Sequence, residues 1–306
     1  MKGSLRPACR FFASGCDGHG VASIPLCSTG TRTGTGASTP AFTLGVGAAT
    51  GAGTALDLPP TATYHRRMLS IRSVSKRFGS LTAVDDLTLE VPAGCIHAFL
   101  GPNGAGKTTT IKMCTGLLRP DAGSIAVAGH DVVTDGMAAR RLMAYVPDEP
   151  YLYERLTGRE FLDFTARIYG LDRERYAARL DAVTERFSLH EFLDHMAEGY
   201  SHGMRQRLVL AAASLHEPKL LIVDEPLVGL DPKHIRIVLT LLRELADQGG
   251  AVLMSTHTLG AVESIADRVT IMDHGRAIAS GTVAELRGDK DLEEAFLSLT
   301  RSDREA

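Results

Sequence analysis

Gly101-Pro-Asn-Gly-Ala-Gly106-Lys107-Thr108 is the stretch that decides the fold of this sequence, because it matches the pattern G-x-x-x-x-G-K-[ST]. The apolar run Cys95–Leu100, which predicts a buried strand, precedes it, and Lys107–Leu118 has the character of a helix. Glycines let backbone N–H groups wrap around phosphates, and a helix N-terminus adds partial positive charge. With average residue usage the pattern arises by chance about once per hundred chains of this size. Its strand–loop–helix setting makes chance rarer still and predicts a phosphate-binding loop.

Two residues of this loop and two acids further along the chain have expected chemical roles. Lys107 would reach the outer phosphates of a nucleotide, and the hydroxyl of Thr108 would ligate Mg²⁺. Leu220-Leu-Ile-Val-Asp224-Glu225 reads as a buried strand with two acids at its carboxyl end, where ligands of open α/β sheets bind. Asp224 would hold Mg²⁺, directly or through water, and Glu225 would polarise the attacking water. Two such acids alone could be a solvated strand end, but after a phosphate loop they indicate nucleotide hydrolysis.

Strand and helix signals alternate from Leu69 onward. Near-continuous apolar strands separated by helices predict an open, mostly parallel α/β sheet, with the helical block Thr157–Leu193 as an inserted subdomain. A capping-box pattern, Thr157-Gly-Arg-Glu160, starts one of the helices. The expected strands are Leu69–Val74, Leu87–Val91, Cys95–Leu100, Ala144–Pro147, Leu220–Val223, Val252–Ser255 and Val269–Met272. The expected helices are Lys107–Leu118, Thr157–Tyr169, Arg173–Phe187, Gly203–Leu215 and Leu292–Leu299.

Composition narrows the class of protein. The 306 residues are 44% hydrophobic and 23% charged, as in ordinary globular proteins, and the net charge of -3 gives no sign of a basic nucleic-acid face. The odd number of cysteines, with no C-x-x-C pair, predicts unpaired thiols. The uncharged stretch Thr33–Leu56 is mostly Gly, Ala and Thr, unlike a membrane span. Any work at a membrane would therefore need a second polypeptide to span it.

The composition changes near residue 67, and this change sets the expected domains. The segment before it is rich in Gly, Ser, Thr and Ala without a hydrophobic period, so we expect disorder. Its scarcity of acids would suit an organelle transit peptide, but amphipathic Arg-rich periodicity is missing. We favour a tail or a mis-assigned start over residues 1–67. One globular domain is expected over 68–287, with its helical subdomain at about 155–215, followed by a tail over 288–306.

A set of motifs in a fixed order makes the chain from about Leu69 to Arg287 resemble the nucleotide-binding subunit of an ATP-binding cassette (ABC) transporter. The phosphate loop and the acids Asp224 and Glu225 are two of them. The others resemble the family's aromatic loop, glutamine loop, signature, subunit-crossing loop and switch histidine: Lys76-Arg-Phe78-Gly79, Tyr145-Val-Pro-Asp148-Glu-Pro150, Tyr200-Ser201-His202-Gly203-Met204-Arg-Gln206-Arg207, Gly229-Leu-Asp231-Pro232 and Ser255-Thr256-His257.

The resemblance implies a fold and a set of site residues. The fold would be an α/β P-loop NTPase with a RecA-like core, an antiparallel β subdomain and an inserted α-helical subdomain. The catalytic residues would be Glu225, His257 and Lys107, and Mg²⁺ would be held by Thr108, Asp224 and Asp148. The residues expected to bind ATP are Phe78, Val84, Gly101, Pro102, Asn103, Gly104, Ala105, Gly106, Lys107, Thr108, Thr109, Asp148, Ser201, Gly203 and Asp231.

Several of these roles depend on a second subunit or compete with a structural role. Ser201 and Gly203 would cap the γ-phosphate of ATP held by the other subunit, so that two cassettes trap two ATP molecules head to tail. Phe78 would stack on adenine, although a phenylalanine alone is more often part of a core. His257 would contact the γ-phosphate and hold Glu225 and water in line, although a lone histidine is more often structural. Asp231 would serve the crossing loop and also cap the helix that begins at Pro232.

The sequence departs from the family pattern at two motifs. Asp148 stands where the family usually has glutamine; its oxygens can still ligate Mg²⁺, but the side chain is shorter and charged. The usual signature Leu-Ser-Gly-Gly-Gln reads Tyr200-Ser-His-Gly-Met, so His202 replaces the first glycine and Met204 the glutamine. We expect ATP capping to survive with altered dimer energetics.

The resemblance implies an ATP-hydrolysing subunit, peripheral on the cytoplasmic face of the cell membrane, that powers a separate permease. It would pair with itself or a paralogue and bind no nucleic acid. Export is favoured over import, because Leu152–Glu160 and the Met204-Arg-Gln-Arg207 variant of the signature resemble the cassettes of drug, lipid and polysaccharide exporters. Tyr151 and Tyr153 are the residues we expect at the permease, while most other apolar groups of Leu156–Phe164 suit the subdomain's own core.

Two other classes compete with transport. A cassette ATPase acting on ribosomes usually carries two cassettes in one chain, and a DNA-repair type has a long coiled coil inserted; this sequence has neither feature. A P-loop kinase or GTPase would lack the signature and the switch histidine, and no guanine-specific Asn-Lys-x-Asp motif is present.

Overall fold

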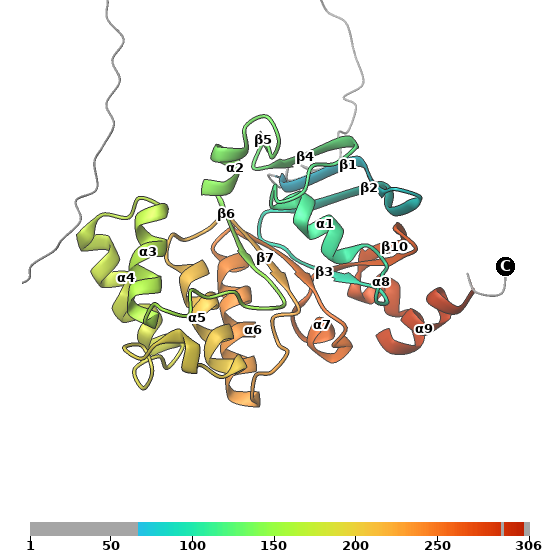
Figure 1. Ribbon diagram of the computed structural model, residues 1–306. Coiled ribbons are helices and arrows are strands. Elements are labelled where there is room, and N and C mark those ends of the chain that lie inside the picture. The colour runs from blue at the N-terminus through green and yellow to red at the C-terminus, as the bar shows by residue number, and fades with distance from the viewer. Residues whose placement is uncertain (1–66, 289–290, 303–306) are drawn as a thin grey trace, which may run out of the picture. The chain divides into compact units, whose positions relative to one another are not determined.

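Residues 67–288 and 291–302 are described by a computed structural model with two β-sheets, of which the smaller lies at the upper edge of the molecule in Figure 1. The expectations for residues 1–66, which include the stretch Thr33–Leu56 and the cysteines Cys9, Cys16 and Cys27, lie outside the described residues. Within the described part of the chain, no helix has both the length and the apolar character to cross a membrane.

The larger sheet has six strands in the order β10-β9-β3-β8-β7-β6. Neighbours from β9 to β6 pair in parallel, and only β10 runs antiparallel to β9. Every residue of β3, β7 and β8 is buried, because helices pack on one face of the sheet and the second, antiparallel sheet packs on the other together with the helix that follows the phosphate loop. The prediction of a mostly parallel sheet is confirmed. The strands are β3 (Ile96–Leu100), β6 (Met143–Val146), β7 (Leu220–Asp224), β8 (Ala251–Ser255), β9 (Arg268–Asp273) and β10 (Arg276–Thr282).

The smaller sheet is antiparallel, in the order β2-β1-β4-β5. Its strands are β1 (Arg67–Phe78), β2 (Leu81–Pro92), β4 (Ala122–Val127) and β5 (His130–Asp131). Strands β1 and β2 are longer than predicted, and β4 and β5 were not predicted. Gly123 weakens the strand pattern of β4, yet a Cβ there would lie 2.3 Å from the carbonyl oxygen of Ser73 on β1. The backbones of β1 and β4 approach so closely that only glycine fits at position 123. The same glycine hides the strand from a reading of the sequence pattern.

The helix after the phosphate loop is shorter than predicted. This helix, α1 (Lys107–Cys114), ends earlier than the predicted Leu118, because Thr115 is its C-cap and Gly116 follows with φ of +72°. The remaining helices outside the helical subdomain are α2 (Gly136–Arg141), α6 (Pro232–Asp247), α7 (Leu259–Ile265), α8 (Val283–Arg287) and α9 (Leu292–Ser302). The predicted tail helix is therefore present and runs three residues further.

Three helices form the block seen at the left of Figure 1: α3 (Gly158–Ile168), α4 (Arg173–Arg186) and α5 (His202–Ser214). The predicted capping box of α3 is confirmed, because Thr157 Oγ1 accepts from the backbone N–H of Glu160 while the Glu160 carboxylate accepts from that of Thr157. Buried Leu162 and Phe187 join this block to the core. The α-helical insertion is thus closely tied to the parallel sheet.

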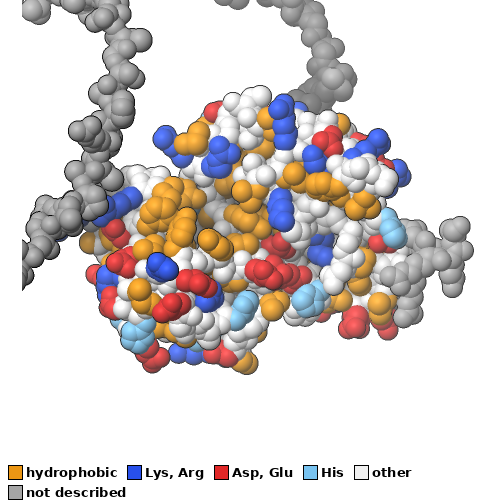
Figure 2. Space-filling model, viewed as in Figure 1, with side chains coloured by type: hydrophobic (Ala, Val, Ile, Leu, Met, Phe, Trp, Pro, Cys, Tyr) orange, Lys and Arg blue, Asp and Glu red, His pale blue; other side chains and the backbone are white. Residues whose placement is uncertain are grey.

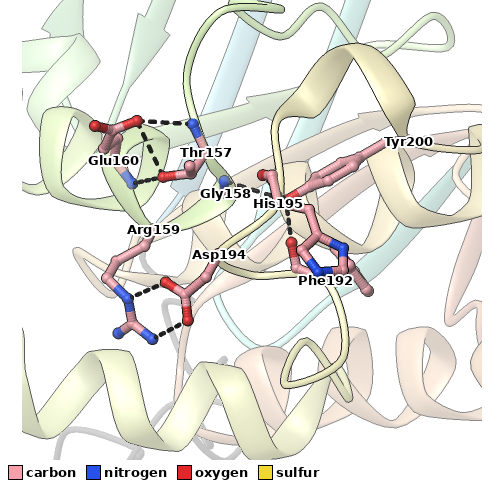
Figure 3. Close-up of polar contacts among 8 residues, drawn as sticks. All are labelled: Thr157, Gly158, Arg159, Glu160, Phe192, Asp194, His195 and Tyr200. Carbon is pink, nitrogen blue, oxygen red and sulfur yellow. Dashed lines mark hydrogen bonds and ion pairs between the residues drawn. The ribbon is translucent and has the colours of Figure 1, made fainter.

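One tyrosine links the start of α3 to the chain just before α5 (Figure 3). The Tyr200 hydroxyl accepts from the backbone N–H of Gly158 at 3.1 Å and donates to the carbonyl of Phe192 at 2.6 Å. A Cβ at Gly158 would lie 2.7 Å from that hydroxyl, so only glycine fits there. A bidentate ion pair between Arg159 and Asp194 closes the same junction from the solvent side. These contacts hold α3 and the segment before α5 together.

Candidate ATP site

The phosphate loop between β3 and α1 is shaped by glycines. Gly101, Gly104 and Gly106 all have positive φ, which other residues adopt at a cost. A Cβ at Gly106 would lie 2.4 Å from the carbonyl oxygen of Ala83, so the loop also needs glycine for space. Gly106 is the N-cap of α1 and supplies no side-chain acceptor, which leaves the first N–H groups of the helix for a ligand.

Lys107 lies inside this loop. Its side-chain nitrogen donates to the carbonyl oxygens of Gly101 at 2.6 Å and Pro102 at 3.2 Å, although only 9% of the residue is exposed. Burial lowers the pKa of Lys107, while the carboxylates of Glu225 and Asp224 act in the opposite direction. A desolvated ammonium held this way attracts anions strongly.

A cavity of about 410 Å³ lies over the phosphate loop and is closed on one side by Phe78, which is 49% exposed. Lys76 lies over the Phe78 ring at 5.6 Å and is itself paired with Asp121. Such an exposed ring beside a phosphate loop suits stacking on a nucleobase. The residues that line this cavity are Phe78, Leu81, Thr82, Ala83, Asn103, Gly104, Ala105, Gly106, Lys107, Thr108, Thr109 and His274.

Val84, expected at the nucleotide, does not line this cavity. Its side chain is fully buried and lies 3.4 Å from where a Cβ of Gly106 would stand. A register irregularity between β1 and β2 lies here, because Lys76 pairs with Val84 while Arg77 pairs with Thr82. Beyond it Val84 joins the core, whereas Thr82 and Ala83 line the cavity.

Two acids follow β7, at the carboxyl end of the sheet. Asp224 is buried, and Ser255 on the adjacent strand donates a hydrogen bond to its carboxylate. Glu225 has φ of +48°, a conformation that costs about 1–3 kcal/mol in a residue other than glycine. Its backbone N–H donates to the carbonyl of Ser255 at 3.1 Å. The sheet thus holds the Glu225 carboxylate in a strained position at the edge of the site.

His257 and Glu225 form an ion pair when the histidine is protonated. Their Nδ1 and Oε2 atoms are 3.0 Å apart, and the backbone N–H of His257 donates to the same oxygen at 3.3 Å. Both residues line a second cavity, of about 540 Å³, which shares three residues with the phosphate loop. The lining of this cavity is Leu100, Gly101, Pro102, Asn103, Asp148, Glu225, Val228, Thr256, His257, Leu259 and Phe296.

Asp148 is the third acid at this edge. Burial and the nearby carboxylates of Asp224 and Glu225 raise its pKa, and His202 lowers it by a smaller amount. The same surroundings raise the pKa of Tyr145 to about 12, mainly through burial. The three carboxyl groups therefore influence one another through space, although within the described residues no three Asp, Glu, His or Cys side chains lie close enough together to form a metal-binding cluster.

The residues of the signature lie apart from both cavities. Ser201 caps α5 by accepting from the backbone N–H of Met204 at 3.3 Å, and Asp231 caps α6 by accepting from that of His234 at 2.9 Å. Ser201, Gly203 and Asp231 line neither cavity. The His202 ring packs against Gly229, where a Cβ would lie 2.3 Å from the ring. The signature and the crossing loop therefore contact each other within one subunit.

Sequence reasoning missed several cavity residues. Leu81, Thr82 and Ala83 begin β2 and belong to no motif, and His274 follows β9 in a tight turn. Phe296 belongs to the predicted tail helix, and only its place in the apolar stripe of that helix could have drawn attention to it.

Comparison with known proteins agrees with this geometry. The sequence profile described as ABC transporter matches residues 84–228. Over 221 residues the chain is 42% identical to the daunorubicin resistance ATP-binding protein DrrA3 of Streptomyces coeruleorubidus, covering 72% of this chain and 70% of that protein. It is 38% identical to the Nod factor export ATP-binding protein I of Burkholderia lata, covering 70% of each. A solved structure of an ATP-binding subunit of an ABC transporter has a TM-score of 0.73 at 36% identity, covering 76% of this chain and 99% of that one.

Proposed function

This chain belongs to the ABC transporter family as one of its ATP-binding subunits, and on that premise we propose that it hydrolyses ATP at Glu225 to drive a membrane permease that exports its cargo. The observation that carries the proposal is the Glu225–His257 pair, which shares a cavity with the phosphate loop. Glu225 would accept a proton from water as it attacks the γ-phosphate. His257 would hold the Glu225 carboxylate in line with that phosphate.

The residues present suit Mg²⁺ as the partner of ATP. The hydroxyl of Thr108 and the carboxylates of Asp224 and Asp148 are hard oxygen donors, which Mg²⁺ prefers, and Mg²⁺ usually takes few protein ligands together with nucleotide phosphates. Bound Mg²⁺ would neutralise charge on the β- and γ-phosphate oxygens. Lys107 would move from the carbonyls of its own loop to those phosphates, since its ammonium lies within the loop already.

Two subunits would complete each ATP site. Ser201 and Gly203 line neither cavity of their own subunit, yet they stand at the exposed N-terminus of the long helix α5. Such an N-terminus attracts phosphate. We infer that they cap the γ-phosphate of ATP held by a second cassette, either a copy of this chain or a paralogue.

The permease would dock on an aromatic surface made of Tyr151, Tyr153 and Phe164. Tyr151 is 76% exposed, and its ring packs edge-on against Tyr153 at 5.9 Å, which packs in turn against Phe164 on α3 at 5.6 Å. Figure 2 shows hydrophobic side chains gathered on the face that carries α3. Leu152 and Leu162 are buried in the subdomain core instead, as expected for most apolar groups of this segment. Exposed aromatic groups in contact with each other are typical of interfaces.

The direction of transport is proposed from the relatives. The names of the Streptomyces and Burkholderia proteins refer to daunorubicin resistance and Nod factor export. We propose that this chain likewise powers an exporter and works on the cytoplasmic face of the cell membrane. Pull-down from detergent-solubilised membranes tests this assignment: an integral-membrane partner supports it, whereas recovery of ribosomes or DNA alone would favour the non-transport class.

Glu225→Gln tests the hydrolytic assignment in the full chain. Loss of the base should slow phosphate release by roughly 10²–10⁴-fold while ATP binding persists. Glu149→Gln is a matched control, because Glu149 is an exposed acid of the same edge that lines neither cavity. Equal turnover of the Glu225→Gln variant and the wild type would remove Glu225 as the base.

A further inference from the structure

The C-terminal helix α9 packs on the catalytic domain through one apolar stripe. Leu292 is fully buried and Ala295 nearly so, and Phe296 packs against the same core cluster. These positions fall on one face at helical spacing. Leu297 points away from this stripe and is 39% exposed. The helix thus has a defined inner face and a solvent face.

The start of α9 is fixed to α7. The backbone N–H of Leu292, which has no partner within its own helix, donates to the Glu263 carboxylate of α7 at 3.1 Å. Asp291 accepts from the backbone N–H of Glu294 at 2.7 Å and caps the helix. Figure 1 shows α9 beside α7 and α8 at the right of the molecule. The position of α9 is therefore coupled to that of α7.

Helix α7 begins just after the switch histidine. Its first residue is Leu259, and its N-cap Thr258 makes no side-chain capping bond. Phe296 of α9, Leu259 and His257 all line the cavity that holds Glu225. The His257 side chain is 69% exposed and contacts Glu225, so its position depends on the backbone that carries it and on the cavity wall.

We propose that α9 is a working part of the ATP site, in which Phe296 positions His257 for hydrolysis. The inference rests on the proposed function. Phe296 and Leu259 line one wall of this cavity and pack against the same core cluster. Through this packing Phe296 keeps the start of α7 in place, so that His257 stays within reach of Glu225. Phe296 touches no reacting atom and is a positioning residue.

Truncation of the ring tests this role in the full chain. Phe296→Ala should lower kcat for ATP hydrolysis by about 10- to 100-fold, because small misplacement of a catalytic group carries large losses of rate. The dissociation constant for ATP should stay within about twofold, since the phosphate loop is unaffected. Leu297→Ala, on the solvent face of the same helix, should leave both values unchanged. Phe296→Leu keeps most of the side-chain volume, so it should retain most of the wild-type kcat.

A double-mutant cycle separates positioning from general loss of structure. In the background His257→Ala, the change Phe296→Ala should have almost no further effect on kcat, because the group that it positions is gone. Additive losses, or equal rates for Phe296→Ala and Leu297→Ala, would overturn the inference. If Phe296→Ala unfolds, Phe296→Val, which removes the ring but leaves a larger side chain than alanine, carries the same cycle. A wild-type chain with no ATPase activity would instead overturn the proposed function.

Discussion

The helices α1 and α5 both begin at a predicted phosphate contact, but their first turns are built differently. The N-cap of α1 is Gly106, which has no side chain, and its free N–H groups face a cavity that also holds Lys107. The N-cap of α5 is Ser201, whose hydroxyl already accepts from Met204, and this N-terminus lines neither cavity. The predicted phosphate contact at α1 therefore lies in a cavity of this chain, whereas the one predicted at α5 lies outside both cavities.

This difference has a physical reason. A loop that surrounds phosphate must supply several donors at short range, so it needs glycines and a buried cation. A surface that meets phosphate only when two subunits close must remain stable in water by itself, and a serine cap provides that stability. The two helix ends should therefore respond differently to mutation.

Lys107→Ala should have the largest effect of these substitutions. It should weaken ATP binding at the phosphate loop and leave the N-terminus of α5 unchanged. Hydrogen bonds to charged groups contribute about 1.5–3 kcal/mol, so ATP affinity of the isolated subunit should fall by about 10- to 150-fold. Fluorescent-nucleotide titration measures this change. Lys112→Ala, an exposed lysine in the last turn of the same helix, is the control and should bind ATP like the wild type. Equal affinities of the two variants would contradict the role of Lys107.

Gly106→Ala should have the next largest effect and shows what the loop requires of its backbone. The new Cβ would meet the carbonyl of Ala83, in addition to a left-handed backbone cost of about 1–2 kcal/mol. Gly104→Ala carries only the backbone cost, since nothing lies within 4 Å of its Cβ position. Urea unfolding should show a greater loss of stability for Gly106→Ala by at least about 1 kcal/mol. A similar loss of stability in both variants would contradict the prediction, because it would mean that the chain moves away from the carbonyl of Ala83 without cost.

Ser201→Ala should affect α5 and leave the loop intact. Loss of an N-cap costs about 1 kcal/mol of stability, whereas ATP affinity of a single subunit should not change. Turnover at low protein concentration should fall, because two subunits must meet. Size-exclusion chromatography with ATP on the Glu225→Gln background reports this association. Ser214→Ala, at the other end of α5, is the control; an equal fall in association there would sink the assignment.

The smallest expected effect concerns Asp148 and pH. Its raised pKa means that the folded protein keeps this proton to a higher pH than the unfolded chain does. Ionisation of Asp148 therefore lowers stability as pH rises from its ordinary pKa to the raised one. Without Mg²⁺, the melting temperature of Asp148→Asn should exceed that of the wild type by more at pH 7.5 than at pH 4. A difference that does not vary with pH would contradict this interpretation.

Features encoded by neighbouring residues were predictable from the sequence. The strand, the glycine loop and the helix at Gly101–Thr108 were predicted together, and so were the capping box at Thr157 and the cap at Asp231. These depend on hydrogen bonds within a few residues of each other. For the same reason, the type of each of these elements was right even where its end was not.

Features set by distant packing were not predictable. The strand β4 is defined by the approach of Gly123 to β1, and Val84 enters the core beside a register irregularity between β1 and β2. Phe296 reaches the ATP site only because α9 folds back onto α7. In each case the contact that fixes the structure joins residues far apart in the sequence, so a local sequence pattern cannot predict it.

The Tyr200 hydroxyl bridge has a mechanical consequence. It joins the first turn of α3 to the residue directly before Ser201, and α3 also carries Phe164 of the aromatic surface. In the proposed assembly, the surface that meets the permease and the surface that meets the second cassette are therefore joined by one short path of hydrogen bonds and one helix. A shift of the permease against Phe164 would reach the signature along this path.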